Sequence, residues 1–192
     1  MSALKIILTI ALLAASAYLG YSLYKTIEEP IMFEAEQTLR DDAAINKLKL
    51  VRQAELAYKL KNGTFTGGFD TLINFIKTDS FEVVKQLGDP NDSTIVVKTQ
   101  ISYRTILDSL FDNDSNMAED LINVPFVAGE QFYLQAQIIV KNEVELPAFQ
   151  CGVPYETLYK GAGQRKYYTT LLGEDLRVGD LQEGTTAGSW DK

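Results

Sequence analysis

The sequence predicts an α+β protein with an N-terminal transmembrane helix, a long amphipathic helix and then a mainly antiparallel β-sheet domain. The stretch Ile6–Tyr24 carries no charge. At about 1.5 Å per helical residue it approaches the ~30 Å hydrocarbon core of a bilayer. Residues 31–61 contain no Pro or Gly and are rich in strong helix formers. From residue 94 onward, several segments alternate apolar and polar residues, which is the period of a strand.

Composition narrows the classes of function. The chain has 192 residues, a net charge of −8, no histidine and one cysteine. An acidic balance argues against nucleic-acid binding, which depends on Lys and Arg. The missing histidines and the lone cysteine exclude histidine-based triads, the usual zinc sets and an internal disulfide. We therefore expect no catalytic residue, no cofactor and no metal site, and we expect Cys151 to be a small buried apolar residue.

The N-terminus has two interpretations. Lys5, the apolar run and the small residues Ala15-Ser16-Ala17 fit a cleaved signal peptide. The run continues to Lys25, however, which favours an uncleaved anchor. The positive charge before the run, and Glu28 and Glu29 after it, favour a cytoplasmic N-terminus. We expect residues 1–29 to form a cytoplasmic stub and anchor in a bacterial inner membrane, and residues 30–192 to form a periplasmic domain.

The long helix is expected over residues 31–61, with Pro30 kinking the path or starting the helix anew. Its core face is predicted from a spacing of three and four residues, which selects Ala44, Leu48, Val51, Ala54 and Tyr58. A second row widens this stripe with Ile45, Leu56 and Leu60. The stripe packs either on the domain's own sheet or on a partner helix. Asn62-Gly63 is expected to end the helix.

A short helix is expected over residues 69–77, where Phe69, Leu72, Ile73 and Ile76 share one face. The apolar segment 81–87 has no clear assignment, and residues 88–92 form a loop.

The sheet region is expected over residues 94–181. Strands are predicted at Thr94–Ile101, at Gln131–Val140 and at Glu143–Val153, the last two joined by a tight turn at Lys141-Asn142. Residues 103–111 fit either helix or strand, and Val124-Pro125-Phe126 resembles an edge segment. Short strands are predicted at 167–172 and 176–181. The residues expected to face inward on the hairpin are Phe132, Leu134, Ala136, Ile138, Val140, Val144, Leu146, Ala148 and Cys151.

Four local patterns partly match known kinds of chemical or binding site. Residues 112–116 begin like a calcium loop, but Met117 replaces the required glycine and Asn123 the bidentate glutamate. Gly161-Ala162-Gly163 lacks the remainder of a phosphate loop. Glu143 and Glu145 share one strand face, which is common on exposed sheets. The tyrosines near the C-terminal end, which fit either sheet packing or a binding surface, are Tyr155, Tyr159, Tyr167 and Tyr168.

The order of an apolar helix, an amphipathic helix and an antiparallel sheet resembles type IV pilins and pseudopilins. The likeness covers the N-terminal third of the chain and includes residues 44–48, residues 52–55, the pair Ala57-Tyr58 and residues 62–65. Ahead of the apolar helix the chain has no prepilin cleavage glycine followed by a phenylalanine, and it has no glutamate early in that helix. The resemblance therefore implies the shape more than filament assembly. As a whole, the chain also resembles single-pass envelope proteins of Gram-negative bacteria.

These observations favour a non-enzymatic, single-pass inner-membrane subunit of a multi-protein envelope complex that serves transport, secretion or a motor. Its expected partners are proteins, a second copy of the chain included, and not nucleic acid. The alternatives are a pilin-like filament subunit and a secreted binding domain released after Ala17. An enzyme is the least favoured class.

Overall fold

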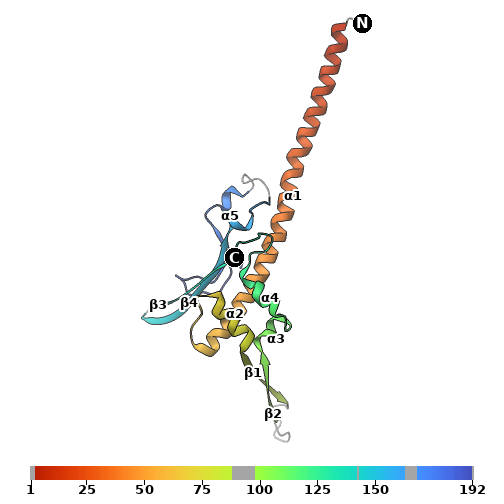
Figure 1. Ribbon diagram of the computed structural model, residues 1–192. Coiled ribbons are helices and arrows are strands. Elements are labelled where there is room, and N and C mark those ends of the chain that lie inside the picture. Colours follow the sequence, from red (N-terminus) through yellow and green to blue (C-terminus); the bar gives the residue numbers. More distant parts are fainter. Residues whose placement is uncertain (1–2, 88–97, 142, 163–167, 192) are drawn as a thin grey trace.

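The computed structural model describes residues 3–87, 98–141, 143–162 and 168–191, with the backbone alone for Leu4 and for residues 81–87 and 98–102. It confirms the α+β class: a long N-terminal helix is followed by a globular part with a three-stranded antiparallel sheet (Figure 1). We call the described residues from Gly63 onward, which pack around the second half of α1, the head.

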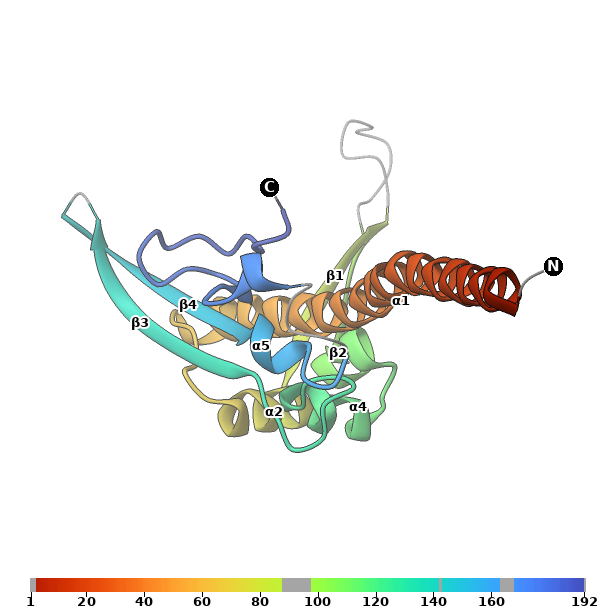
Figure 2. The same ribbon diagram turned by 90° about the horizontal axis from the view of Figure 1, so that it is seen from above.

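The helix α1 spans Ala3–Asn62 without interruption and contains Pro30 in its interior. The predicted break at Pro30 is therefore wrong, and the expected boundary between residues 29 and 30 falls inside one helix. Proline lacks the N–H that would bond the carbonyl of Thr26, and its ring crowds that carbonyl. The helix curves along its length instead of ending (Figure 2), which is how a helix accommodates a proline when neighbouring turns stay bonded.

The C-terminal end of α1 lies where the sequence predicts it. Gly63 adopts a left-handed backbone with φ of 79°, and its N–H donates to the carbonyl of Lys59 at 2.8 Å. A glycine at this cap satisfies an otherwise orphaned helix carbonyl without steric cost.

The predicted core face of α1 is confirmed for Ala44, Leu48, Val51 and Ala54, which are all fully buried. Tyr58 and Ile45 are partly buried and pack on this core. The second predicted row is wrong toward the C-terminal end of the helix, because Leu56 and Leu60 are exposed. These two side chains lie at the edge of the covered side, where they line an open hollow with α2 and α3.

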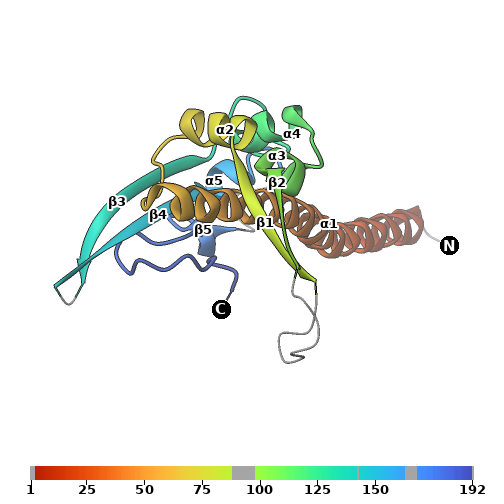
Figure 3. The ribbon, with the colours of Figure 1, turned by 90° about the horizontal axis from the view of Figure 1, so that it is seen from below.

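The second half of α1 lies between a helical layer and the three-stranded sheet (Figure 3). The helical layer contains α2 (Phe69–Thr78), α3 (Ile106–Phe111) and α4 (Ser115–Glu119). The sequence predicts a helix at residues 69–77, and α2 lies there. Its Phe69, Leu72 and Ile76 are buried as expected of one apolar face.

The strands β1 (Ser80–Leu87) and β2 (Lys98–Thr105) form a separate two-stranded antiparallel sheet, with Ser80 opposite Thr105. The unassigned segment 81–87 is thus a strand. Of the strand predicted at 94–101, residues 94–97 lie outside the described residues. The ambiguous stretch 103–111 is strand to Thr105 and then helix α3, because the Thr105 hydroxyl accepts the N–H of Asp108 and caps that helix.

The main sheet has the order β3-β4-β5, with β3 at Tyr133–Lys141, β4 at Val144–Pro154 and β5 at Asp175–Val178. The predicted hairpin is confirmed, with Lys141 opposite Val144. The prediction of inward-facing residues is wrong near the tip, where the exposed residues are Ile138, Val140, Val144 and Leu146. The hairpin extends past the end of α1 (Figure 2), so the helix does not cover its tip. The opposite face of the tip contacts the C-terminal loop, where Lys141 donates to the carbonyl of Glu183.

The predicted strand at residues 167–172 is wrong: the described part forms the 3-10 helix η3 (Thr169–Leu171). The strand expected at 176–181 begins earlier, as β5, and ends at Val178. Val124-Pro125-Phe126 forms a turn with Phe126 at a φ of 63°, not an edge strand. The remaining elements are η1 (Asp120–Ile122) and α5 (Tyr155–Leu158).

Candidate functional site

The most distinctive surface is the first half of α1. Every described residue from Ile6 to Tyr24, which we call the apolar segment, is exposed. The apolar segment projects away from the head (Figure 1). By length and composition, α1 contains a stretch that is apolar enough to cross a membrane, and none of that stretch is buried.

Polar contacts follow the apolar segment directly. The Tyr24 hydroxyl donates to Glu28 at 3.2 Å, and Lys25 pairs with Glu29 at 3.5 Å. Both are one-turn contacts on the surface of the helix, of the kind that stabilise an isolated helix by a few tenths of a kcal/mol. The first buried side chain is Phe33, eight residues beyond Lys25 and hence about 12 Å further along the axis.

Apolar side chains remain exposed beyond the apolar segment. Ile27, Ile31, Met32 and Leu39 are each more than half exposed, at 55%, 59%, 66% and 56%. Lys25 separates Ile27 from the apolar segment, and Glu28 and Glu29 also lie between that segment and Ile31. An exposed apolar row on a helix flanked by charges is typical of a surface that contacts another protein.

Arg40 attaches α1 to the head. It is buried, its Nη1 donates to the carbonyls of Leu158 and Lys160 at 2.9 and 3.1 Å, and its Nη2 lies 2.9 Å from Glu36. Leu158 is the last residue of α5, where helix carbonyls lack intrahelical partners, and Lys160 lies two residues beyond it.

Three of the four C-terminal tyrosines lie together, and Tyr167 is outside the described residues. The Tyr159 and Tyr168 rings pack on Phe33 of α1, and Tyr155 stacks on Tyr159. The Tyr159 hydroxyl donates to Asp41 at 2.7 Å. Burial raises the pKa of Asp41, and burial together with this carboxylate raises the pKa of Tyr159. These tyrosines hold the head on α1 and do not form an open binding surface.

An apolar hollow of about 710 Å³ lies beside the C-terminal end of α1. Its walls include Leu56 and Leu60 from α1, Phe75 from α2, and Ile106 and Leu110 from α3. Leu60 is 90% exposed, so this hollow borders a second exposed apolar surface.

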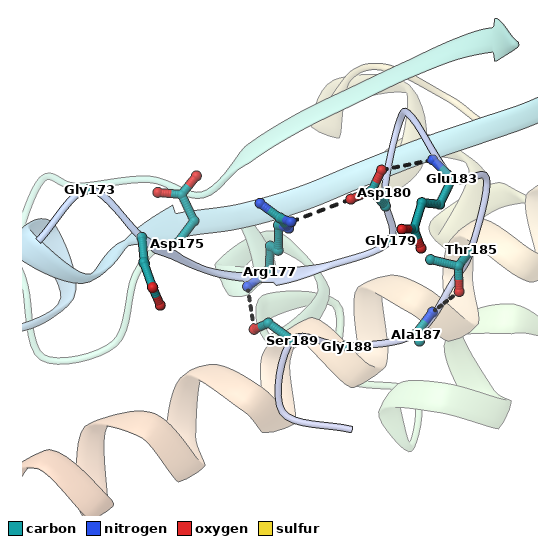
Figure 4. Close-up of a pocket in the computed structure, with 11 residues that line it drawn as sticks. Gly173, Asp175, Arg177, Gly179, Asp180, Glu183, Thr185, Ala187, Gly188 and Ser189 are labelled. Carbon is teal, nitrogen blue, oxygen red and sulfur yellow. Dashed lines mark hydrogen bonds and ion pairs between the residues drawn. The ribbon is translucent and has the colours of Figure 1, made fainter. Parts of the chain in front are cut away.

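A polar hollow of about 520 Å³ lies in the C-terminal loops, shown in Figure 4. Arg177 lies 3.4 Å from Asp180, whose other oxygen accepts the backbone N–H groups of Gln182 and Glu183. These hydrogen bonds lower the pKa of Asp180. The carboxylate of Asp180 is thus used to fold its own loop.

The sequence patterns that resemble chemical sites have structural roles or lie exposed on the surface. Asp114 caps α4 by accepting the N–H groups of Asn116 and Met117. Glu145 is exposed on the hairpin, and Glu143 occupies its turn with a φ of 66°. Within the described ranges, no group of three or more acidic or cysteine side chains is arranged to hold a metal ion. Cys151 is fully buried, as predicted.

Two buried charged residues of α1, Arg40 and Glu55, were not anticipated from the sequence. Glu55 is fully buried. The available signal was its spacing, because position 55 lies four residues after Val51 and therefore on the same face of the helix. A charged residue in that position is unusual, since acidic side chains are almost never fully buried without a partner.

The fold and these surfaces define a class: an α+β protein whose long N-terminal helix is half packed in a head and half exposed and apolar. Comparisons with protein-family models, with curated proteins and with solved structures find no match for this chain.

Proposed function

We propose that this chain is a non-enzymatic, single-pass subunit of a multi-protein complex in a bacterial envelope, anchored in the inner membrane by its apolar segment. One observation carries the proposal: within a single helix, residues 6–24 are apolar and uncovered, whereas the residues that face the head from Phe33 onward are buried. Exposing so much apolar surface to water is costly, at roughly 25 cal/mol per Å². A bilayer removes that cost.

The exposed row Ile27, Ile31, Met32 and Leu39 supports a protein partner for the helix. Ile31, Met32 and Leu39 lie beyond Glu28 and Glu29, so a bilayer centred on the apolar segment would leave them uncovered. The charge bias at the two ends of the segment favours a cytoplasmic N-terminus and a periplasmic head.

The membrane assignment is tested by fractionating bacteria that express the full chain. The protein is expected in the membrane fraction after a high-salt wash. The double variant Ile10→Arg, Leu13→Arg is expected to lose membrane retention, because each arginine near the centre of a spanning helix costs about 2.5–3.5 kcal/mol. The control Leu56→Arg, Leu60→Arg adds the same charge to the same helix at exposed positions and is expected to stay in the membrane. Equal behaviour of the two variants would contradict the anchor.

Complex formation is tested by solubilising native membranes in a mild detergent and measuring the particle size. A particle larger than one chain is expected, and the double variant Ile31→Gln, Leu39→Gln is expected to reduce its size. A monomer in native membranes would overturn the proposal of a complex.

A pilin-like filament subunit is the second candidate, favoured by the unbroken passage of α1 from its exposed half into the head. It predicts processing near the N-terminus, whereas release by signal peptidase predicts Tyr18 as the first residue. The mass of the mature protein distinguishes the three cases, since the anchored subunit keeps its full N-terminal segment.

A further inference from the structure

Glu55 is fully buried. It lies on the side of α1 that faces the α1–α2 loop, residues 63–68, and the strand β4. This loop carries Phe65, whose ring lies 4.7 Å from that of Phe149 on β4. Gly67 lies close to β3, where an added Cβ would be 3.4 Å from the backbone nitrogen of Ala136. The loop therefore covers the inner face of the hairpin.

The Glu55 carboxyl is only half satisfied. Oε2 accepts the N–H of Thr66 at 3.0 Å. Oε1 is buried and has no hydrogen-bond partner among the described residues. A buried carboxylate needs a cation or several donors, because a low-dielectric interior otherwise disfavours the charged form.

The groups around Glu55 do not supply a cation. On α1 itself, Arg52 pairs with Asp191 at 3.2 Å, and the Nζ of Lys59 lies over the Phe65 ring at 4.7 Å. The loop residues 63–68 include no titratable side chain. From β4 comes Cys151, a buried thiol. Burial, opposed only by the Thr66 N–H, raises the pKa of Glu55 to about 8.

We propose that Glu55 is a proton-operated latch: the protonated carboxyl holds the α1–α2 loop on the hairpin, and loss of its proton to water releases the loop. The charged form needs water around both oxygens, and water reaches the site only if the loop moves. The latch thus couples solvent pH to the exposure of the surface between α1 and β4. It does not depend on membrane anchoring or on the partners of the chain.

Cys151 reports the opening because it is the chain's one cysteine and is fully buried beside this site. In the full chain in detergent, we would measure its rate of labelling by a small thiol reagent from pH 6 to pH 9. The wild-type rate divided by the Glu55→Gln rate at the same pH cancels the titration of the thiol itself. We expect this ratio to rise at least tenfold across that range. The matched variant Glu145→Gln, on an exposed part of β4, is expected to follow the wild type. A ratio that stays constant with pH would overturn the latch.

Hydrogen exchange of the wild-type chain gives a second measurement that needs no folded Glu55→Gln protein. Peptides covering residues 63–68 are compared with peptides from α2 at each pH, so that the intrinsic pH dependence divides out. We expect the loop to lose protection, relative to α2, as pH rises from 6 to 9. Parallel behaviour of the two segments would contradict the proposal.

The raised pKa of Glu55 makes the folded state less stable as pH rises. The folded state holds the proton of Glu55 more tightly than the unfolded state, so the stabilising effect is complete below about pH 4.5 and is lost as pH rises to about 8. The unfolding equilibrium constant of the wild type, relative to that of Glu55→Gln, is expected to increase on the order of tenfold per pH unit within that range. A decrease in this relative unfolding constant as pH rises would exclude a protonated Glu55 carboxyl in the folded state.

Discussion

Arg40 joins the long helix to the head through contacts that only a planar, forked side chain makes. Its guanidinium reaches two carbonyls beside α5 and Glu36 of its own helix at once. Lysine carries all its donors on one nitrogen, whereas these contacts use the separate Nε, Nη1 and Nη2 positions of Arg40. The side chain is buried, so unmade contacts would leave polar groups without water.

We expect Arg40→Lys to lower the free energy of unfolding by about 1–3 kcal/mol, the cost of leaving buried polar groups unsatisfied. The measurement is urea unfolding of the full chain in detergent. The matched control is Arg52→Lys, which alters a half-exposed ion pair with Asp191 and is expected to cost less than about 1 kcal/mol. Equal losses would show that the Leu158 and Lys160 carbonyls do not depend on Arg40.

Gly152 is required by the close approach of β5. A Cβ at this position would lie 2.7 Å from the carbonyl oxygen of Leu176 and 2.9 Å from the Tyr133 hydroxyl. We expect Gly152→Ala to destabilise the head by about 1–3 kcal/mol, because overpacking forces backbone shifts. Thermal unfolding measures the effect. Gly68→Ala is the control, since nothing lies within 4 Å of a Cβ there, and its effect is expected within about 1 kcal/mol.

At the scale of elements, the second half of α1 carries both buried and exposed leucines. Leu48 is fully buried and Leu60 is 90% exposed. Leu48→Ala is expected to cost about 2–5 kcal/mol, the usual range for a buried leucine. Leu60→Ala is expected to change the free energy of unfolding by no more than about 0.5 kcal/mol. Denaturant unfolding of both variants checks the pair, and a large loss at Leu60 would mean that a partner covers it under the conditions of measurement.

Pro30 weakens the helix locally although it does not end it. Pro30→Ala restores an N–H that donates to the carbonyl of Thr26, and it removes a residue that costs roughly 3 kcal/mol in a helix interior. We expect slower amide hydrogen exchange in residues 27–33 of the variant, with no change in α2. Unchanged exchange would show that the turn at Pro30 is held by something other than its own hydrogen bonds.

At the scale of the whole molecule, the head is built without the apolar segment. The core that it forms with α1 begins at Phe33 and includes residues from α1, the helical layer and the main sheet. Deleting residues 1–24 is therefore expected to leave the far-UV circular dichroism per head residue and the free energy of unfolding unchanged. The shortened chain should also stay in solution without detergent. Loss of cooperative unfolding would show that the head needs the first half of α1.

The sequence predicted the local elements whose signals lie close together along the chain. The spacing of Ala44, Leu48, Val51 and Ala54 identified the core face of α1, Gly63 marked its end, and alternation marked the β3–β4 hairpin. The same patterns failed where burial depends on distant segments. Ile138 and Val140 continue the alternation of β3 but lie beyond any covering helix. Leu56 and Leu60 continue the stripe of α1, but they line an open hollow where α2 and α3 do not close over them. The strand predicted at 167–172 failed for a related reason: no neighbouring strand pairs with its described part, which folds as η3.

By itself, the sequence determined that the chain has an uncharged apolar segment of spanning length, a long helix after it and an antiparallel sheet beyond, because these depend on composition and short-range period. Only the tertiary structure decided that α1 passes unbroken through Pro30, because the cost of a proline is weighed against the packing and hydrogen bonds on both sides of it. The tertiary structure also decided that Glu55 is buried with one unpartnered oxygen. The neighbours of Glu55 come from the α1–α2 loop and from β4. No local pattern in the sequence indicates which distant segments will enclose this side chain.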